Sequence, residues 1–142
     1  MKGKLSRSIF WALIIVFIVL AISIFTPPAA FAPAFRGGLF LRLFASSGAA
    51  FFLLGVALIV LTVKERVQGI LKIFLILTGA SAVGLPVFVL LHNAVSGLFN
   101  TEESVLFIMA TIVCTIAFLV GVVGSVVLAI KSKQAKHSSQ NS

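Results

Sequence analysis

Charged residues are scarce in this chain. Asp, Glu, Lys and Arg make up 10% of its 142 residues, whereas 61% of the residues are hydrophobic. A typical soluble domain has about 25% charged residues, and a water-soluble fold of this length needs far more polar surface. The composition therefore excludes a soluble protein and indicates a single domain whose solvent is the lipid bilayer.

Cysteine is nearly absent as well. The chain has one cysteine, Cys114, which lies in the middle of a long apolar run. A lone cysteine can form neither a disulfide within the chain nor a CxxC redox pair. This excludes a thiol oxidoreductase of the quinone-linked type, and we interpret Cys114 as a small apolar packing residue.

Groups that carry chemistry inside a membrane are missing too. No Asp, Glu, Lys or Arg lies near the middle of any apolar run, although such residues mark proton relays and ion-coupled sites. The HExxH motif of metalloproteases is absent, no glycine-rich phosphate loop follows a strand, and the serines have no His and Asp partners at membrane depth. We therefore expect no enzymatic activity, no catalytic residue, no metal and no cofactor.

What the chain does have is four long apolar runs. A membrane-spanning helix needs about 20 apolar residues, and backbone groups cannot stay unpaired in hydrocarbon, so these runs predict α-helices. The predicted fold class is all-α, an integral membrane four-helix bundle. Its spans are expected at about 9–25, 46–63, 70–91 and 104–130, between an N-terminal segment 1–8 and a basic, disordered tail 131–142.

The Lys and Arg residues indicate the orientation of these spans. Nine of the eleven fall on one side, in the N-terminus, the connection between the second and third spans, and the tail, whereas Arg36 and Arg42 fall on the other. The positive-inside rule then predicts that both termini are cytoplasmic, and the asymmetry excludes insertion in both directions. Here the cations would meet anionic lipid headgroups. The basic stripe with interleaved aromatics typical of nucleic-acid binding is missing, so nucleic acid is excluded as a partner.

The N-terminal region has a second interpretation. Residues MKGKLSRS, an apolar stretch and PAAFAPA together resemble a secretory signal with a cleavage site at Ala30-Phe31-Ala32. The apolar stretch is longer than usual for a signal and Pro33 would follow the cut, which favours an uncleaved span. Cleavage would remove the first span and leave the other three in the same orientation.

The connection between the first two spans also allows two interpretations. Phe and Leu residues recur there at helical spacing around Arg36 and Arg42, as in an amphipathic helix lying on the outer surface. Alternatively, the second span begins near Leu39 and the Arg42 side chain reaches out to the headgroups. The sequence favours neither interpretation.

Small residues gather in the third and fourth spans. Helices in lipid are held together by close contact, so small residues mark their packing surfaces. We predict two seams that pack against each other, formed by Ala80 and Gly84 in the third span and by Ala110, Cys114, Ala117, Gly121 and Ser125 in the fourth. Pro86 lacks an N–H and leaves the carbonyl of Ala82 without its usual partner, which predicts a kink.

Polar residues lie at the outer ends of the same two spans. His92 and Asn93 follow the third span, and Glu102 and Glu103 precede the fourth. One histidine and two carboxylates could hold a divalent metal, but their spacing is not that of a known ligand motif. The competing interpretation is that both glutamates suit the positive end of the fourth helix, with Thr101 as its N-cap. If the chain has a polar site, we expect it at this outer rim.

The second half of the chain, Leu71 to Lys131, carries a resemblance. The runs LKIFLILTGASAVGLPVFVLLHN and FIMATIVCTIAFLVGVVGSVVLAIK resemble small four-span membrane proteins of bacteria and archaea that have no assigned function. The resemblance implies a prokaryotic inner-membrane protein and implies no activity.

Two functions remain as expectations. The first is a non-enzymatic structural or accessory subunit that associates with itself or with a larger membrane complex through the small-residue seams. The alternative is a small transporter or channel subunit that uses the Pro86 kink and the outer His92 region, since kinked, glycine-rich helices also form gates.

Overall fold

The computed structural model describes residues 4–25, 39–99 and 104–138, and the elements in these ranges are helical. They are α1 (Lys4–Phe25), α2 (Leu39–Lys64), α3 (Ile70–Phe99), α4 (Ser104–Ile108), the π-helix η3 (Met109–Cys114) and α5 (Thr115–Ser138). The last three follow one another without a break and form one long rod. These elements confirm the predicted all-α class, and four helices are long and apolar enough to cross a membrane, as a multi-pass protein requires.

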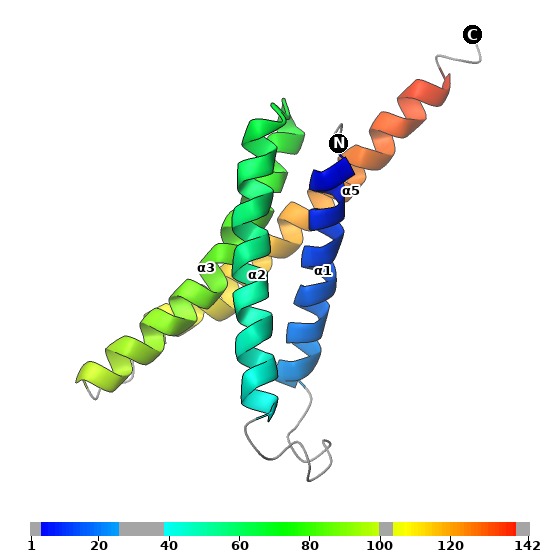
Figure 1. The fold of residues 1–142 in the computed structure, drawn as a ribbon. Helices are drawn as coiled ribbons and strands as arrows, with labels where there is room; N and C mark the ends of the chain where they lie inside the picture. The colour runs from blue at the N-terminus through cyan, green and yellow to red at the C-terminus, as the bar shows by residue number, and fades with distance from the viewer. Residues whose placement is uncertain (1–3, 26–38, 100–103, 139–142) are drawn as a thin grey trace.

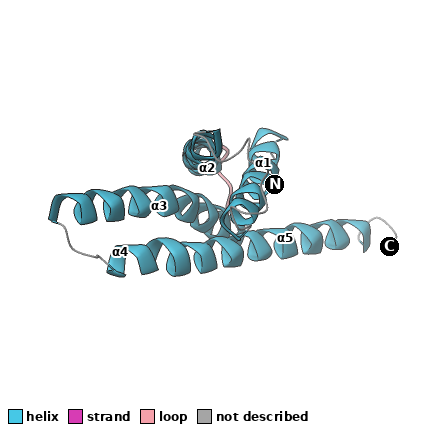
Figure 2. Cartoon of the chain, turned by 90° about the horizontal axis from the view of Figure 1, so that it is seen from below, coloured by secondary structure: helices cyan, strands magenta, loops and turns pink. Residues whose placement is uncertain are grey.

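The helices are arranged as two crossed pairs. Helices α1 and α2 run antiparallel, and α3 runs antiparallel to the rod of α4, η3 and α5 (Figure 1). The second pair passes obliquely across the first, as the view from below also shows (Figure 2). Helix α3 joins the pairs, because it packs against α2 and also against α5 and η3. The four expected apolar helices are therefore present, but they are not four near-parallel rods, and the bundle packing stays a prediction.

Helix length explains the oblique crossing. The apolar part of α2, Ala45–Lys64, has 20 residues and is about 30 Å long, which matches a bilayer's hydrocarbon core. The apolar helix α3 has 30 residues and is about 45 Å long. A helix that exceeds the hydrocarbon thickness is accommodated mainly by tilting. If α1 and α2 stand upright in a membrane, α3 and the rod beside it are therefore expected to be inclined.

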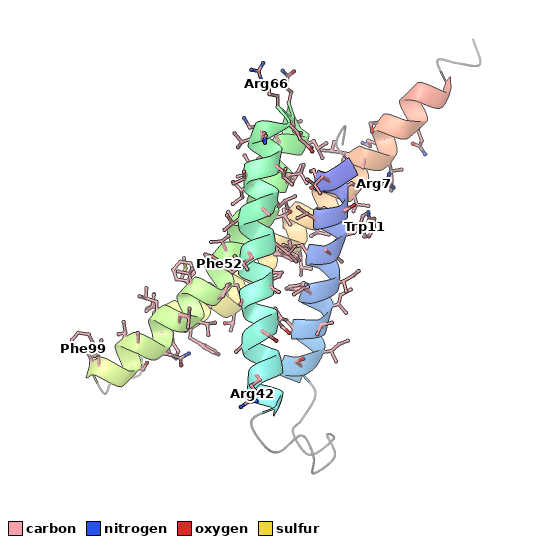
Figure 3. All side chains as sticks on the ribbon, viewed as in Figure 1. Arg7, Trp11, Arg42, Phe52, Arg66 and Phe99 are labelled. Atoms are coloured by element: carbon pink, nitrogen blue, oxygen red, sulfur yellow. The ribbon has the colours of Figure 1, made fainter. Side chains whose placement is uncertain are left out.

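Four helix boundaries differ from the expected ones by more than one residue, the first being the start of α1, at Lys4 instead of Ile9. Helix α2 starts at Leu39 and runs on without interruption, which supports the interpretation that the second span begins there, with Arg42 exposed near the start of the helix (Figure 3). Helix α3 extends to Phe99, eight residues past the expected end at Leu91. The tail expected to be disordered from Lys131 is helical through Ser138, because its Lys, Gln and Ala residues are good helix formers. The proposed cleavage site near Ala30 lies outside the described residues.

Aromatic rings fill the centre of the molecule. The Phe118 ring lies 4.4 Å from that of Phe17 and 5.3 Å from that of Phe51, measured between centroids. Leu13, Leu20 and Ala82 complete this cluster, so all four long helices contribute to it. A second cluster of Phe10, Leu58 and Leu75 lies nearer the 65–69 turn. Side chains therefore occupy the space between the helices.

Buried hydroxyl groups bond within their own helices. Thr62, Thr78 and Ser81 each donate a hydrogen bond of 2.7–2.8 Å to the carbonyl oxygen four residues earlier. Such bonds satisfy a polar side chain in a place where neither water nor another polar group is at hand. These residues can therefore lie at helix contacts without acting as a ligand site.

The two ends of the molecule differ in charge. The start of α1, the end of α5 and the turn between α2 and α3 lie at one end in Figure 1. Arg7 and Arg66 mark this end in Figure 3, whereas Arg42 and Phe99 lie at the opposite end. The described residues thus place the positions expected on one side of the membrane at one end of the fold.

Candidate functional site

The contact between α3 and α5 is built on two glycines of α5. A Cβ atom added at Gly121 would lie 2.9 Å from the backbone nitrogen of Thr78 and 3.0 Å from the carbonyl oxygen of Phe74. Gly124 instead lies against the side-chain ring of Phe74. The backbone of α5 therefore lies directly on α3, and no side chain fits between them at this point.

The buried face of the fourth span contains the residues of the expected seam except Ala117. Ala110, Cys114, Gly121 and Ser125 are buried, whereas Ala117 is half-buried and Phe118 takes the buried position instead. The reason is that Phe118 supplies a ring to the central cluster, which an alanine methyl group cannot fill. The structure thus brings this set of small residues together on the inner face of the rod, and α3 lies against part of it.

The expected seam of the third span needs a correction. Ala80 is exposed, so it does not share a buried face with Gly84, which is half-buried. The buried residues of this turn are Thr78, Gly79, Ser81 and Ala82. Successive helix residues differ by about 100° around the axis, so neighbours such as Ala80 and Ser81 can face opposite surroundings.

The contact between α2 and α3 was missed by the sequence analysis. A Cβ atom at Gly55 would lie 2.9 Å from the carbonyl oxygen of Gly79 and 2.9 Å from the Cβ of Ala82, and one at Gly79 would lie 2.9 Å from the carbonyl oxygen of Gly55. These glycines allow the two backbones to touch. The signal that could have indicated this contact is Gly55 itself, a lone glycine within the apolar run of the second span.

A matched pair of alanines in α3 tests this assignment. Ala82→Leu is expected to lower the melting temperature strongly, since Ala82 is completely buried against α2 and overpacking a close contact typically costs about 1–3 kcal/mol. Ala80→Leu should leave the melting temperature nearly unchanged, because Ala80 is exposed. Thermal unfolding of the purified variants, followed by loss of the monodisperse elution peak, measures both. Equal losses would contradict the assignment.

Gly84 and Pro86 lie beside the π-helix. A Cβ atom at Gly84 would lie 3.2 Å from the Sγ of Cys114, the last residue of η3. Pro86 is half-buried inside α3, which stays helical on both sides of it, so the expected kink remains a prediction. A proline-containing helix thus packs against a segment whose own hydrogen bonding departs from the α-helical pattern. Such π-helical segments often occur at functional sites.

The π-helix η3 has no evident signal in the sequence. Within it, the hydroxyl of Thr111 donates a hydrogen bond of 2.6 Å to the carbonyl oxygen of Phe107, one turn earlier. A threonine can make this bond in an ordinary α-helix as well, so the residue type does not distinguish the two forms.

The predicted outer polar site is described only in part. His92 is half-buried and its ring lies 5.6 Å from that of Phe107, whereas Asn93 is exposed. Both residues lie inside α3 rather than after it, because the helix extends to Phe99. Glu102 and Glu103 lie outside the described residues. Within the described ranges, no group of three or more His, Cys, Asp or Glu side chains could hold a metal ion.

Two serines are almost completely buried. Ser6 in α1 and Ser125 in α5 are about 1% exposed, and their hydroxyl groups have no hydrogen-bond partner. Both lie within one turn of residues of the second apolar cluster, Phe10 for Ser6 and Val126 for Ser125.

Comparison with known proteins gives no match. No protein family, no curated protein and no solved structure is significantly similar to this chain. The resemblance to small four-span prokaryotic membrane proteins therefore rests on the residues quoted for it.

Proposed function

We propose that this chain is a non-enzymatic, multi-pass protein of the cell membrane that acts as a structural or accessory subunit. Its partner is a second copy of itself or a larger membrane complex, and both of its termini lie in the cytoplasm. The excess of Lys and Arg at the N-terminus, the α2–α3 connection and the tail supports this orientation. No enzymatic activity, metal or cofactor belongs to this proposal.

The main observation that supports the proposal is that aromatic side chains fill the space between the helices. Phe17, Phe51 and Phe118 occupy the space where a path between the helices would run. The described Lys and Arg side chains whose exposure is known all lie exposed near helix ends and not at this depth. Among the described residues, the aromatic cluster at the centre therefore provides neither the polar side chains that line a conduction path nor the ionisable groups of a proton relay.

The small residues do not provide the association surface. Gly84, Gly121 and Gly124 face other helices of the same chain, so their contacts are already occupied. The outer half of α3 and the adjoining α4 extend away from α1 and α2 (Figure 1). We call residues 90–99 and 104–108 the outer hairpin. Its exposed large side chains are Leu90, Leu91, Leu98, Phe99, Val105, Phe107 and Ile108. We place the association on the outer hairpin.

A photo-crosslinking amino acid at Leu98 tests this placement in native membranes. Leu98 is 81% exposed and is expected to give an adduct with protein, either a second copy or a subunit of a complex. The matched control is Ile15 in α1, which is 61% exposed and is expected to give lipid adducts alone. Lipid adducts alone at both positions would contradict an accessory role through the outer hairpin.

A small transporter or channel subunit is the second candidate. The observation that favours it is the contact of Gly84, two residues before Pro86, with Cys114 of η3, since interrupted helices form gates in transporters. In this case purified protein in liposomes passes a solute, and Pro86→Ala or His92→Ala changes the flux without changing expression. Absence of flux across ions and small solutes would remove this candidate and leave the first.

A further inference from the structure

The turn between α2 and α3 has an unusual residue at its key position. The N–H of Val67 donates to the carbonyl of Thr62 at 3.3 Å, and the N–H of Arg66 donates to the carbonyl of Val63 at 3.2 Å. This pair of bonds is the Schellman motif that ends many helices. Arg66 occupies its left-handed position, with a φ of 49°.

Glycine is the usual residue at this position. A Cβ atom crowds the backbone in the left-handed region, which makes any other large side chain there unfavourable. Arg66 is the one non-glycine residue with a positive φ among the described residues. Residues in such unfavourable backbone conformations cluster at functional sites, so the side chain of Arg66 is a candidate for a functional role.

The surroundings of Arg66 are strongly positive. Lys64 at the end of α2 and Lys72 near the start of α3 are both exposed, as is Arg66 itself. Arg7 of α1 lies at the same end of the molecule (Figure 3). The one described acidic residue is Glu65, and its buried carboxylate oxygen has no hydrogen-bond partner. Among the described residues, therefore, this turn carries the three cations Lys64, Arg66 and Lys72 against the one carboxylate of Glu65 and keeps a net positive charge.

We propose that the α2–α3 turn binds the phosphate of an anionic phospholipid headgroup, with Arg66 as its main contact. The turn directly follows the apolar part of α2, so it lies at the depth of the headgroups when α2 spans the membrane. The guanidinium group can hold two phosphate oxygens at once, and Lys64 and Lys72 add attraction to anionic lipid. The proposal needs the four spans but does not depend on the accessory role of the chain.

Lipid retention by the purified full-length chain tests the proposal. The protein is equilibrated with equal amounts of phosphatidylglycerol and phosphatidylcholine that have the same acyl chains, and native mass spectrometry counts the lipids retained. The wild type should retain more phosphatidylglycerol. Arg66→Gln should reduce that preference about fivefold, as expected for one basic residue near a membrane surface. Arg66→Lys should keep part of the preference, because lysine keeps the charge but not the planar fork.

Two further variants separate binding from folding and from overall charge. Arg66→Gly should reduce the preference as far as Arg66→Gln does and yet raise the melting temperature in detergent without anionic lipid, because glycine adopts the φ of 49° without strain. Arg42→Gln removes an exposed arginine at the opposite end and should leave the preference unchanged. Inorganic phosphate should not displace the lipid.

Four outcomes would overturn the proposal. The first is equal retention of both lipids by the wild type, and the second is an unchanged preference in Arg66→Gln. The third is an equal loss in Arg42→Gln, which would reflect overall charge and not a site at the turn. The fourth is displacement by inorganic phosphate, which would make the free anion the ligand in place of the lipid.

Discussion

Gly121→Leu is expected to give little or no folded protein. The new side chain would meet the backbone nitrogen of Thr78 and the backbone oxygen of Phe74, which lie 2.9 Å and 3.0 Å from the position of its Cβ atom. Backbone atoms of a packed helix cannot move aside as a flexible side chain can, so α5 has to separate from α3. Overpacking typically costs about 1–3 kcal/mol, and a clash with backbone belongs at or above the upper end of that range.

The yield of monodisperse protein and its melting temperature measure this effect. The matched control is Gly48→Leu, at a helical glycine of α2 outside the outer hairpin, where an added Cβ atom has no neighbour within 4 Å. That variant should behave like the wild type, apart from any small gain from replacing a helical glycine. If Gly121→Leu melted at the wild-type temperature, the direct contact of α5 with α3 would be wrong.

Phe118→Ala is expected to produce the second-largest loss of stability. Phe118 is 2% exposed and its ring contacts those of Phe17 and Phe51. Truncating a buried phenylalanine to alanine typically costs about 3–5 kcal/mol in soluble proteins, through lost contacts and the cavity that remains. In lipid the loss of packing contacts is the main part, because lipid tails are as apolar as the interior.

The next residue along the chain provides the control for Phe118. Leu119 is 47% exposed, so Leu119→Ala should lower the melting temperature much less. Phe118→Leu should lie between the two, since leucine fills part of the space. An equal effect of Phe118→Ala and Leu119→Ala would mean that the aromatic cluster does not hold the helices together.

The candidate site shows why a sequence in lipid is harder to interpret than one in water. In a soluble helix, the contrast between polar and apolar residues marks the buried face. Here both the interior and the lipid are apolar, so Ala80 and Ala82 look alike, although one is exposed and the other is completely buried. Residue size is the remaining signal, and it indicated Gly121 and Cys114 correctly as buried but selected Ala117 where Phe118 is used.

The sequence by itself indicated lipid as the solvent of this protein, and it determined the long apolar helices and the absence of ionisable groups from their centres. The free energy of transferring a helix into lipid is approximately the sum of the contributions of its side chains. Each contribution depends little on the neighbouring residues, so it can be obtained from the sequence. Tertiary structure alone decided the crossing of the two helix pairs, the contact of Gly55 with Gly79, the π-helix beside Pro86 and the left-handed Arg66. Those features depend on which helix faces are in contact. A shift of one residue rotates the contact face by about 100° around the helix axis and so brings different side chains into the contact.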